Sequence, residues 1–337
     1  MSDQYRTIAE RAGYADCTGN GHRSGNVAPT ARGRLRVDGA DAASFLQALV
    51  SNDVTALHPG EGAYATYLTP QGRMLADLEI YLLPDGIVCS VAAELAAPLT
   101  ARLDQLIFSE DVRVTDISAE IGELVVVGSL AAEVLGEALA IAPETLTALP
   151  ELGHVGLARG FVSRAGVAAL PSYRVFMPVR DLAASMVLLD RMGLPALSDA
   201  RLDALRIEHG RPAWGADLTT ETIPLEAGLL ERAISTSKGC YVGQEIVIRI
   251  LHRGGGRVAR RLVKLTFDEA SAGEPAAGDV LATGEGTEAG RLTSVSRSPT
   301  TDRWIALGYL GRDYAEVGRR VTVRGTALTA TVAGMAG

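Results

Sequence analysis

The stretch SKGCYVGQE, residues 237–245, surrounds a cysteine with residues that could make its thiol reactive. Lys238 stands two positions before Cys240, so in an extended segment both side chains leave the backbone on the same side. An ammonium near a thiol favours the thiolate, which is the form that ligates metals and attacks electrophiles. Gln244 and Glu245 could open a short helix, whose free N–H groups favour a nearby anion, although the following IVIRIL run also suits a strand. These residues are equally consistent with a buried cysteine that acts as a small apolar side chain.

A second candidate is Asp77 in YLTPQGRMLADLEIY, a run that alternates like a strand. The alternation puts Asp77 on one face with Leu75 and Glu79. A carboxylate on that face must meet solvent, a cavity or a partner, because burying it unpaired is costly. We expect a polar face open to solvent, and a ligand-facing carboxylate is the alternative.

The stretch RIEHGRPAWGADL ends a predicted helix and continues into a loop. Arg206 and Glu208 lie at the end of the helix, and Trp214 lies in the loop. A loop tryptophan beside cations could stack on a flat heterocycle. It could also be a hydrophobic plug over the end of the helix.

The chain has 337 residues and a net charge of −8, which disfavours general nucleic-acid binding and predicts no DNA partner. Residues 232–264 nevertheless carry eight basic side chains and one acid, Glu245. Within them HRGGG, which contains Arg253, and the following Arg257 offer glycines and cations suited to a phosphate or carboxylate, but the segment lacks the strand and helix context of a nucleotide-binding loop. The segment is either a solvated basic face or a site for an anion.

Three widely spaced cysteines, Cys17, Cys89 and Cys240, make neither a disulfide framework nor a closed zinc site. A metal would therefore have to be shared with a partner. The N-terminus has no apolar core of a secretory signal, and no run is long and apolar enough to cross a bilayer. We expect a cytoplasmic protein with no membrane partner.

The pattern along the chain predicts an α+β protein with a C-terminal all-β domain. Residues 1–33 form an N-terminal segment and loop. Residues 34–255 combine helices with antiparallel strands joined by tight turns at Pro-Gln-Gly and Pro-Asp-Gly; one helix is expected at 94–108, and another begins at Ser198 and stops at Gly210. Residues 256–337 contain short strand-like runs without a helical pattern, which is typical of a small barrel or sandwich.

Together these segments resemble the YgfZ family, folate-binding proteins of iron–sulfur cluster maintenance related to the glycine-cleavage T-protein, a tetrahydrofolate-dependent aminomethyltransferase. KGCYVGQE matches the signature Lys-Gly-Cys-aromatic-x-Gly-Gln-Glu, and FLQALVSNDVTAL, YLTPQGRMLADLEIY, LRIEHGRPAWGADL and IPLEAGL fall in family order. The resemblance implies a ring-like arrangement of antiparallel-sheet and helix lobes, two of them in residues 34–255, and a C-terminal all-β barrel. It also implies a folate site in a central channel.

The chain departs from the T-protein at two places. The T-protein carries two adjacent acids where this chain has Ala76 and Asp77. Its Gly-Tyr-Thr-Gly-Glu segment, whose glutamate holds the pterin ring, is replaced near ALPSYRVFMP by a stretch without an acid.

The leading hypothesis is a tetrahydrofolate-binding accessory protein for iron–sulfur cluster assembly or repair. The resemblance makes Cys240 the functional cysteine and implies a transient [2Fe–2S] cluster shared with an A-type carrier protein or a cluster-containing client. One thiolate cannot hold such a cluster alone. Lys238 would tune the thiol, while Gln244 and Glu245 would orient the loop and contribute to the folate site.

In the same hypothesis Asp77, Trp214, Arg206 and Glu208 contribute to the folate site. Arg253 and the other basic residues would receive the folate glutamate tail or an acidic carrier surface. The alternative is an enzyme, a folate-dependent aminomethyl or methyl transferase in which Asp77 polarises the folate or the substrate amine. A third hypothesis, an RNA-binding factor of tRNA modification, lacks an aromatic stacking strip beside the basic residues.

Overall fold

The structure is a computed structural model that describes residues 25–27 and 32–337, apart from 168–169, 253–254 and 269–272. The chain divides into two compact units. Unit 1 consists of residues 1–46, 54–64 and 78–202, and unit 2 consists of residues 47–53, 65–77 and 203–337. The position between residues 255 and 256, expected as a domain boundary, lies inside unit 2.

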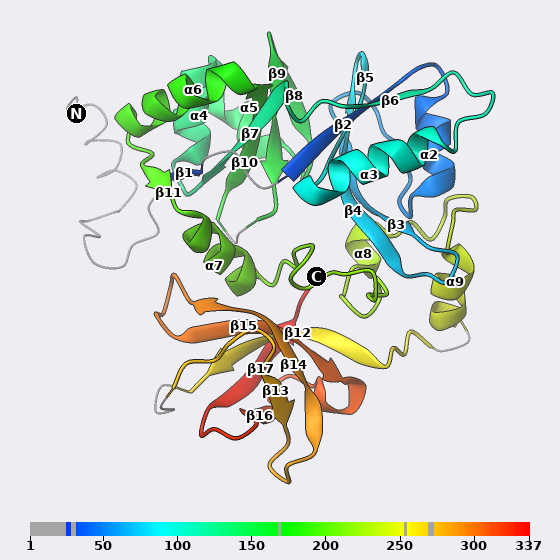
Figure 1. Ribbon diagram of the computed structural model, residues 1–337. Helices are drawn as coiled ribbons and strands as arrows, with labels where there is room; N and C mark the ends of the chain where they lie inside the picture. The colour runs from blue at the N-terminus through cyan, green and yellow to red at the C-terminus, as the bar shows by residue number, and fades with distance from the viewer. Residues whose placement is uncertain (1–24, 28–31, 168–169, 253–254, 269–272) are drawn as a thin grey trace. The chain divides into compact units, whose positions relative to one another are not determined.

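Unit 1 contains a six-stranded sheet of order β11-β1-β7-β10-β9-β8, packed against three helices (Figure 1). Its strands are β1 (Gly25–Val27), β7 (Ile121–Val127), β8 (His154–Leu157), β9 (Gly160–Ala165), β10 (Ser172–Pro178) and β11 (Ala196–Leu197). The helices are α4 (Ala131–Leu139), α5 (Pro143–Ala148) and α6 (Val179–Arg191). Alternation directs Leu124 and Val126 of β7 and Tyr173 of β10 into one apolar cluster with these helices, so Glu123 and Arg174 point to the opposite face.

A second sheet, of order β3-β4-β5-β2-β6, contains the strands predicted around the two tight turns. Its strands are β2 (Arg32–Asp38), β3 (Gly62–Leu68), β4 (Met74–Leu83), β5 (Gly86–Ala92) and β6 (Arg113–Asp116). Helix α2 (Ala42–Leu49) precedes β3, and α3 (Ala93–Asp104) packs on β2, β5 and β6. α3 ends before the predicted residue 108, because the Glu110 carboxylate accepts the N–H groups of Phe108 and Ser109 and fixes a turn there.

The polar face of β4 is buried, so the expectation of a solvent-facing Asp77 and Glu79 is wrong. Asp77 is 4% exposed and Glu79 is 5% exposed. Within unit 1, Glu79 accepts hydrogen bonds from Arg174 Nη2 at 3.1 Å and from the Tyr81 hydroxyl at 3.1 Å. Arg174 of β10 also donates to Glu123 of β7. A guanidinium from the other sheet compensates the burial of these glutamates, and alternation along β4 alone does not reveal such a partner.

The C-terminal part of unit 2 is a closed barrel of order β12-β15-β14-β13-β16-β17 (Figure 1). Its strands are β12 (Arg260–Phe267), β13 (Val280–Ala282), β14 (Glu288–Arg297), β15 (Trp304–Gly311), β16 (Arg320–Val323) and β17 (Thr329–Met335), with a 3-10 turn, η1 (Arg312–Tyr314). The barrel encloses its own apolar cluster, which includes Val263, Leu292 and Leu310. With the sheets and helices of unit 1, the barrel confirms the predicted α+β fold.

Among the described residues, the last three α-helices before the barrel in the chain are α7 (Asp199–His209), α8 (Leu230–Ala233) and α9 (Gln244–His252). The predicted start and stop of α7 are observed, since Ser198 Oγ accepts the Arg201 N–H at 3.3 Å and Gly210 has φ +82°. The IVIRIL run forms the body of α9, so it is a helix and not a strand.

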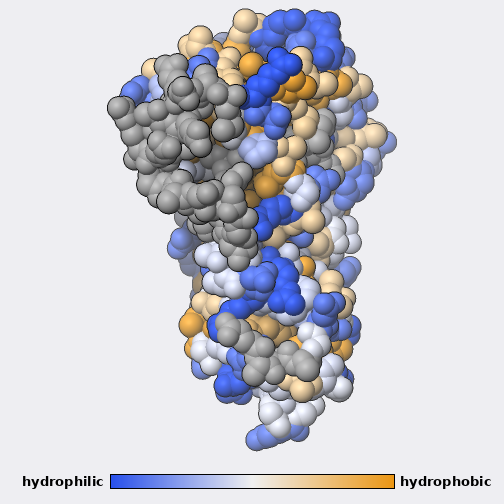
Figure 2. All heavy atoms as spheres, turned by 90° about the vertical axis from the view of Figure 1, so that its left-hand side faces the viewer, coloured by the Kyte–Doolittle hydropathy of each residue, from blue (hydrophilic) through white to orange (hydrophobic). Residues whose placement is uncertain are grey.

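Polar and apolar side chains are interspersed on the face of the molecule drawn in Figure 2. In the part of the chain that the structure describes, no helix combines the length and the apolar character needed to span a bilayer.

Candidate functional site

The loop that carries Cys240, between α8 and α9, is anchored by the side chain of Lys238. Lys238 is 8% exposed, and its Nζ donates to the carbonyl oxygens of Gln47 at 2.7 Å, Val50 at 2.6 Å and Asn52 at 2.9 Å. These carbonyls belong to the end of α2 and the turn after it, where a helix leaves carbonyl oxygens without intrahelical partners. Lys238 therefore caps the C-terminal end of α2.

The surroundings of Lys238 act both on its charge and on its hydrogen bonds. Burial lowers the pKa of Lys238 to about 8, and the charge of Asp53 opposes that shift. The ring centroid of Tyr241 lies 5.2 Å from Nζ. An ammonium has three protons, and three carbonyl oxygens receive them. A tuning effect of Lys238 on Cys240 would therefore act through its charge and not through a hydrogen bond.

Cys240 follows this anchor in the loop with an exposed side chain. No described atom lies within 4 Å of the position that a Cβ would take on Gly239, so the backbone beside the thiol is open. A buried, apolar role belongs instead to Cys89 in β5, whose pKa is raised to about 12 by burial. Of these two cysteines, Cys240 is the one that a partner or reagent can reach.

The start of α9 packs against the turn between β3 and β4, within unit 2. Gly243 has φ +83°, and a Cβ there would lie 2.5 Å from the Thr69 carbonyl oxygen and 2.9 Å from Leu68 Cβ. Similarly, a Cβ on Gly72 would lie 2.8 Å from Ile246 Cβ. The segments YLTPQGRM and KGCYVGQE, far apart in the sequence, therefore contact each other.

Gln244 and Glu245 occupy the first turn of α9. Glu245 is exposed and pairs with Arg249 one turn later at 2.7 Å, which stabilises the helix itself. The Gln244 N–H donates to the Tyr241 carbonyl at 3.2 Å and closes the turn after the cysteine.

The basic residues of segment 232–264 are spread over α8, the Cys240 loop, α9, the segment between α9 and β12, and β12 itself. Arg249 pairs with Glu245 on α9, whereas Arg260 of β12 pairs with Glu226 at 2.8 Å. Arg253, predicted to bind an anion, lies outside the described residues. At least two of the cations thus have acidic partners within the chain.

Asp77 lies on the part of β4 that belongs to unit 2. The Met74 N–H, three residues before it, donates to the carbonyl of the buried Thr222 at 2.9 Å. The neighbouring Arg73 pairs with Glu221 at 2.6 Å. These contacts hold the start of β4 against the loop before α8. The Asp77 carboxylate therefore projects from an anchored strand, which suits a group that must meet a substrate atom in a defined direction.

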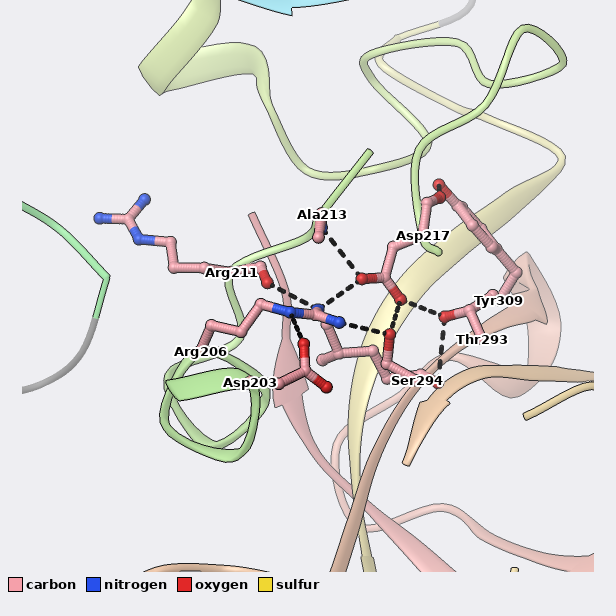
Figure 3. Close-up of polar contacts among 9 residues, drawn as sticks. Asp203, Arg206, Arg211, Ala213, Asp217, Thr293, Ser294 and Tyr309 are labelled. Carbon is pink, nitrogen blue, oxygen red and sulfur yellow. Dashed lines mark hydrogen bonds and ion pairs between the residues drawn. The ribbon is translucent and has the colours of Figure 1, made fainter. Parts of the chain in front are cut away.

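Arg206 is the centre of a hydrogen-bond network with Asp217, a residue that sequence reasoning did not single out (Figure 3). Arg206 donates through Nε to Asp203 at 2.6 Å, through Nη1 to Asp217 at 2.6 Å and through Nη2 to Ser294 Oγ at 2.9 Å. Nη1 also donates to the Arg211 carbonyl at 3.2 Å. Each of the three guanidinium nitrogens therefore has a protein acceptor, and the network ties α7 to the following loop and to β14.

The structure gives Glu208 and Trp214 different surroundings. Glu208 accepts hydrogen bonds from the hydroxyls of Ser298 and, at 2.9 Å, Thr300, in the loop after β14. Trp214 is half-buried and forms an isolated bridge with Leu218. Arg206 and Glu208 thus bond to the protein, while Trp214 retains exposed surface.

Ser51 is a further connection that sequence reasoning missed. Its buried hydroxyl donates to the Ala233 carbonyl at 2.7 Å and accepts the Thr66 N–H at 2.8 Å, and its carbonyl accepts the Ser235 N–H at 3.0 Å. The available signal was the polar Ser-Asn-Asp run directly after α2. Through Ser51, this run binds Ala233 and Ser235, which lie in the segment that leads into the Cys240 loop.

Among the described residues, no group of three or more His, Cys, Asp or Glu side chains could hold a metal ion.

Comparison with known proteins identifies the family. Residues 22–238 match the model of the GCVT N-terminal domain, and residues 260–336 match the glycine cleavage T-protein C-terminal barrel domain. The chain is 32% identical over 317 residues to an aminomethyltransferase of Cutibacterium acnes, which covers 89% of this chain and 83% of the relative. The chain belongs to the glycine cleavage T-protein family, which confirms that part of the resemblance.

A further relative and a solved structure are also similar to this chain. The chain is 28% identical over 297 residues to a putative chloroplastic transferase of Arabidopsis thaliana, covering 86% of this chain and 66% of the relative. A crystal structure of the glycine cleavage system aminomethyltransferase from Bartonella henselae matches with a TM-score of 0.82 and 23% identity, over 94% of this chain and 86% of that chain. The match to this crystal structure shows that the two chains share a fold.

Proposed function

We propose that this protein is a tetrahydrofolate-dependent one-carbon transferase in which Asp77 acts on the substrate amine or on the folate. The observation that carries the proposal is the burial of Asp77, which is 4% exposed on an anchored strand of a T-protein-family chain. A buried carboxylate is better suited than an exposed one to hold an N–H group and exchange a proton with it. Relatives named aminomethyltransferase support the same reaction class.

Unit 2 offers the kinds of side chain that a folate needs, including a carboxylate for an N–H group and an indole for the flat heterocycle. The bound folate would supply the nitrogen atoms that accept the one-carbon unit. Asp77 would hold an N–H group, and the half-buried indole of Trp214 would stack on the heterocycle. Arg206 would act indirectly, because its donors already hold the loop that contains Trp214. Gln244 and Arg253 remain proposed contacts to the polar parts of the folate.

The test is anaerobic turnover with tetrahydrofolate and an aminomethylated dithiol donor. Asp77→Asn keeps the size of the side chain and removes its charge and basicity. We expect turnover to fall by about 100-fold or more, with an unchanged circular dichroism spectrum.

Asp85→Asn is the control, since Asp85 is an exposed acid in the turn between β4 and β5, paired with Arg36 at 3.0 Å. Its turnover should equal that of the wild type. Absence of both folate binding and turnover with amine and thioether donors would exclude the transferase proposal.

A second proposed function, support of iron–sulfur cluster assembly or repair, is favoured by the exposed thiol of Cys240 on its anchored loop. Cys240 would contribute one thiolate to a [2Fe–2S] cluster whose remaining ligands come from a carrier protein.

This second function is tested by mixing the protein with a [2Fe–2S]-loaded carrier under anaerobic conditions. Cluster absorbance should co-elute with the wild type and not with Cys240→Ser. Equal co-elution of both proteins would exclude Cys240 as the ligand. Because the transferase assay reads turnover and this assay reads cluster retention, the two functions are decided independently.

A further inference from the structure

We propose that Asp217 is a positioning residue that fixes Trp214 as a platform for a flat heterocycle. The identity of that heterocycle rests on the proposed function, but the fixing of Trp214 is a property of the free protein. The buried Asp217 carboxylate already accepts hydrogen bonds at both oxygens from protein donors, so it acts through Trp214 and does not itself touch a ligand.

The Asp217 carboxylate accepts hydrogen bonds from four donors on three parts of unit 2 (Figure 3). Oδ2 accepts from Arg206 Nη1 at 2.6 Å and from the Ala213 N–H at 3.0 Å. Oδ1 accepts from Ser294 Oγ at 2.7 Å and from the Thr293 hydroxyl. Four donors are the full capacity of two carboxylate oxygens. The group therefore joins α7, the loop after it and β14 at one point.

Hydrogen bonds of the residues directly before and after Trp214 hold its backbone in place. Ala213, directly before it, gives its N–H to the Asp217 carboxylate, and the Ala213 carbonyl accepts the N–H groups of Asp217 at 2.9 Å and Leu218 at 3.0 Å. Gly215, directly after it, has φ +82° and donates to the Leu218 carbonyl at 2.8 Å. The backbone of Trp214 is thus held within a closed turn whose ends meet at Asp217.

The charge of Asp217 is what ties this turn to Arg206. Without it, Arg206 would retain one carboxylate partner, Asp203, which is 49% exposed at its side chain and therefore holds the guanidinium less firmly. Asp217→Asn removes the charge at constant volume. Its amide can face Thr293 and Ser294, because hydroxyls also accept hydrogen bonds, so the variant is expected to fold.

The experiment uses the Trp304→Phe background, in which Trp214 is the only tryptophan, because the chain has 2. Time-resolved fluorescence anisotropy and acrylamide quenching report the mobility and accessibility of Trp214. We expect Asp217→Asn to increase both. We also expect its dissociation constant for 5-formyltetrahydrofolate to rise about 10-fold, as for loss of one aromatic contact.

Glu226→Gln is the matched control. Glu226 is 8% exposed and also links a loop to the barrel, through Arg260 at 2.8 Å, but lies outside the Trp214 turn. This variant should lower the melting temperature and leave the Trp214 signals and the folate affinity unchanged.

Three outcomes would overturn the inference. Wild-type anisotropy and quenching in Asp217→Asn would show that Asp217 does not fix Trp214, whether or not folate binds. Equal changes in Asp217→Asn and Glu226→Gln would show a general loss of stability. A mobile Trp214 with unchanged folate affinity would exclude the platform role. If the wild type binds no folate, the proposed function fails, and the anisotropy of the free protein still decides the positioning role.

Discussion

Lys238 shows at the residue scale how one side chain can support a neighbouring group without reacting. Its Nζ bonds to three carbonyls at 2.6–2.9 Å, and it lies two residues before the exposed Cys240. A buried ammonium with three acceptors is a structural centre, since each carbonyl would otherwise lose a partner. Lys238 is buried while Cys240 is exposed, so the two side chains do not share one side of the loop as they would in an extended segment.

Lys238→Met should remove this anchor while keeping an unbranched side chain of similar length. The free energy of unfolding should fall by about 2 kcal/mol or more, because three carbonyls lose a charged donor. Denaturant titration measures this, and the rate of reaction of Cys240 with an aromatic disulfide should not decrease. Arg249→Met, in an exposed pair, should cost about 0.5 kcal/mol or less. A thiol rate about tenfold slower at unchanged stability would instead establish a tuning role for Lys238.

At the element scale, the packing of α9 on the β3–β4 turn decides where the Cys240 loop lies. The contact is close because Gly243 has no side chain, and its φ of +83° suits glycine. Gly243, directly before α9, leaves room for Leu68 and Thr69, and Gly72 of the turn leaves room for the side chain of Ile246 on α9. The glycines of the motif therefore have a packing role beside the thiol.

Gly243→Ala should destabilise the protein by about 2 kcal/mol or more, because the added Cβ meets backbone and the left-handed conformation is strained. Gly239→Ala is the control, with no described atom within 4 Å of the new methyl group. Its effect should stay within about 0.5 kcal/mol. Thermal and denaturant unfolding measure both variants, and equal effects would refute this account of the contact.

At the scale of the whole molecule, stability depends on pH through groups that folding buries. His154 is 5% exposed, and its ring centroid lies 5.7 Å from that of Tyr81 and 5.2 Å from that of Phe161. Burial lowers the pKa of His154 below its ordinary value of 6.5, although contacts with the Leu152 and Leu82 carbonyls oppose the shift. The unfolded chain therefore binds a proton at this position more readily than the folded chain.

Because the folded pKa is the lower one, the contribution of His154 to stability is present above pH 6.5 and is lost as the pH falls through the folded pKa. The free energy of unfolding should decrease between about pH 7 and pH 5, and His154→Gln should reduce that slope. The control His58→Gln replaces an imidazole that is 82% exposed at its side chain and should keep the wild-type slope. Denaturant titrations across this pH range test the prediction, and equal slopes in His154→Gln and wild type would contradict it.

Local patterns predicted the elements that depend on neighbouring residues. Ser198 and Gly210 marked the ends of α7, and the turn residues marked the hairpins. The burial of Asp77 and Glu79 was not predicted, because the partner of Glu79, Arg174, lies on a different sheet. Pairing between strands far apart in sequence is not visible in the alternation of either strand.

By itself the sequence determined the fold class, the order of its elements and the likeness to T-protein relatives, since these depend on periodicity, turn residues and motif order along the chain. The tertiary structure decided what individual side chains do. It turned Lys238 toward carbonyls of α2, engaged Arg206 with Asp217, and left Cys240 exposed. Each of these outcomes depends on a partner distant in sequence or on access to solvent, and only the folded chain supplies either one.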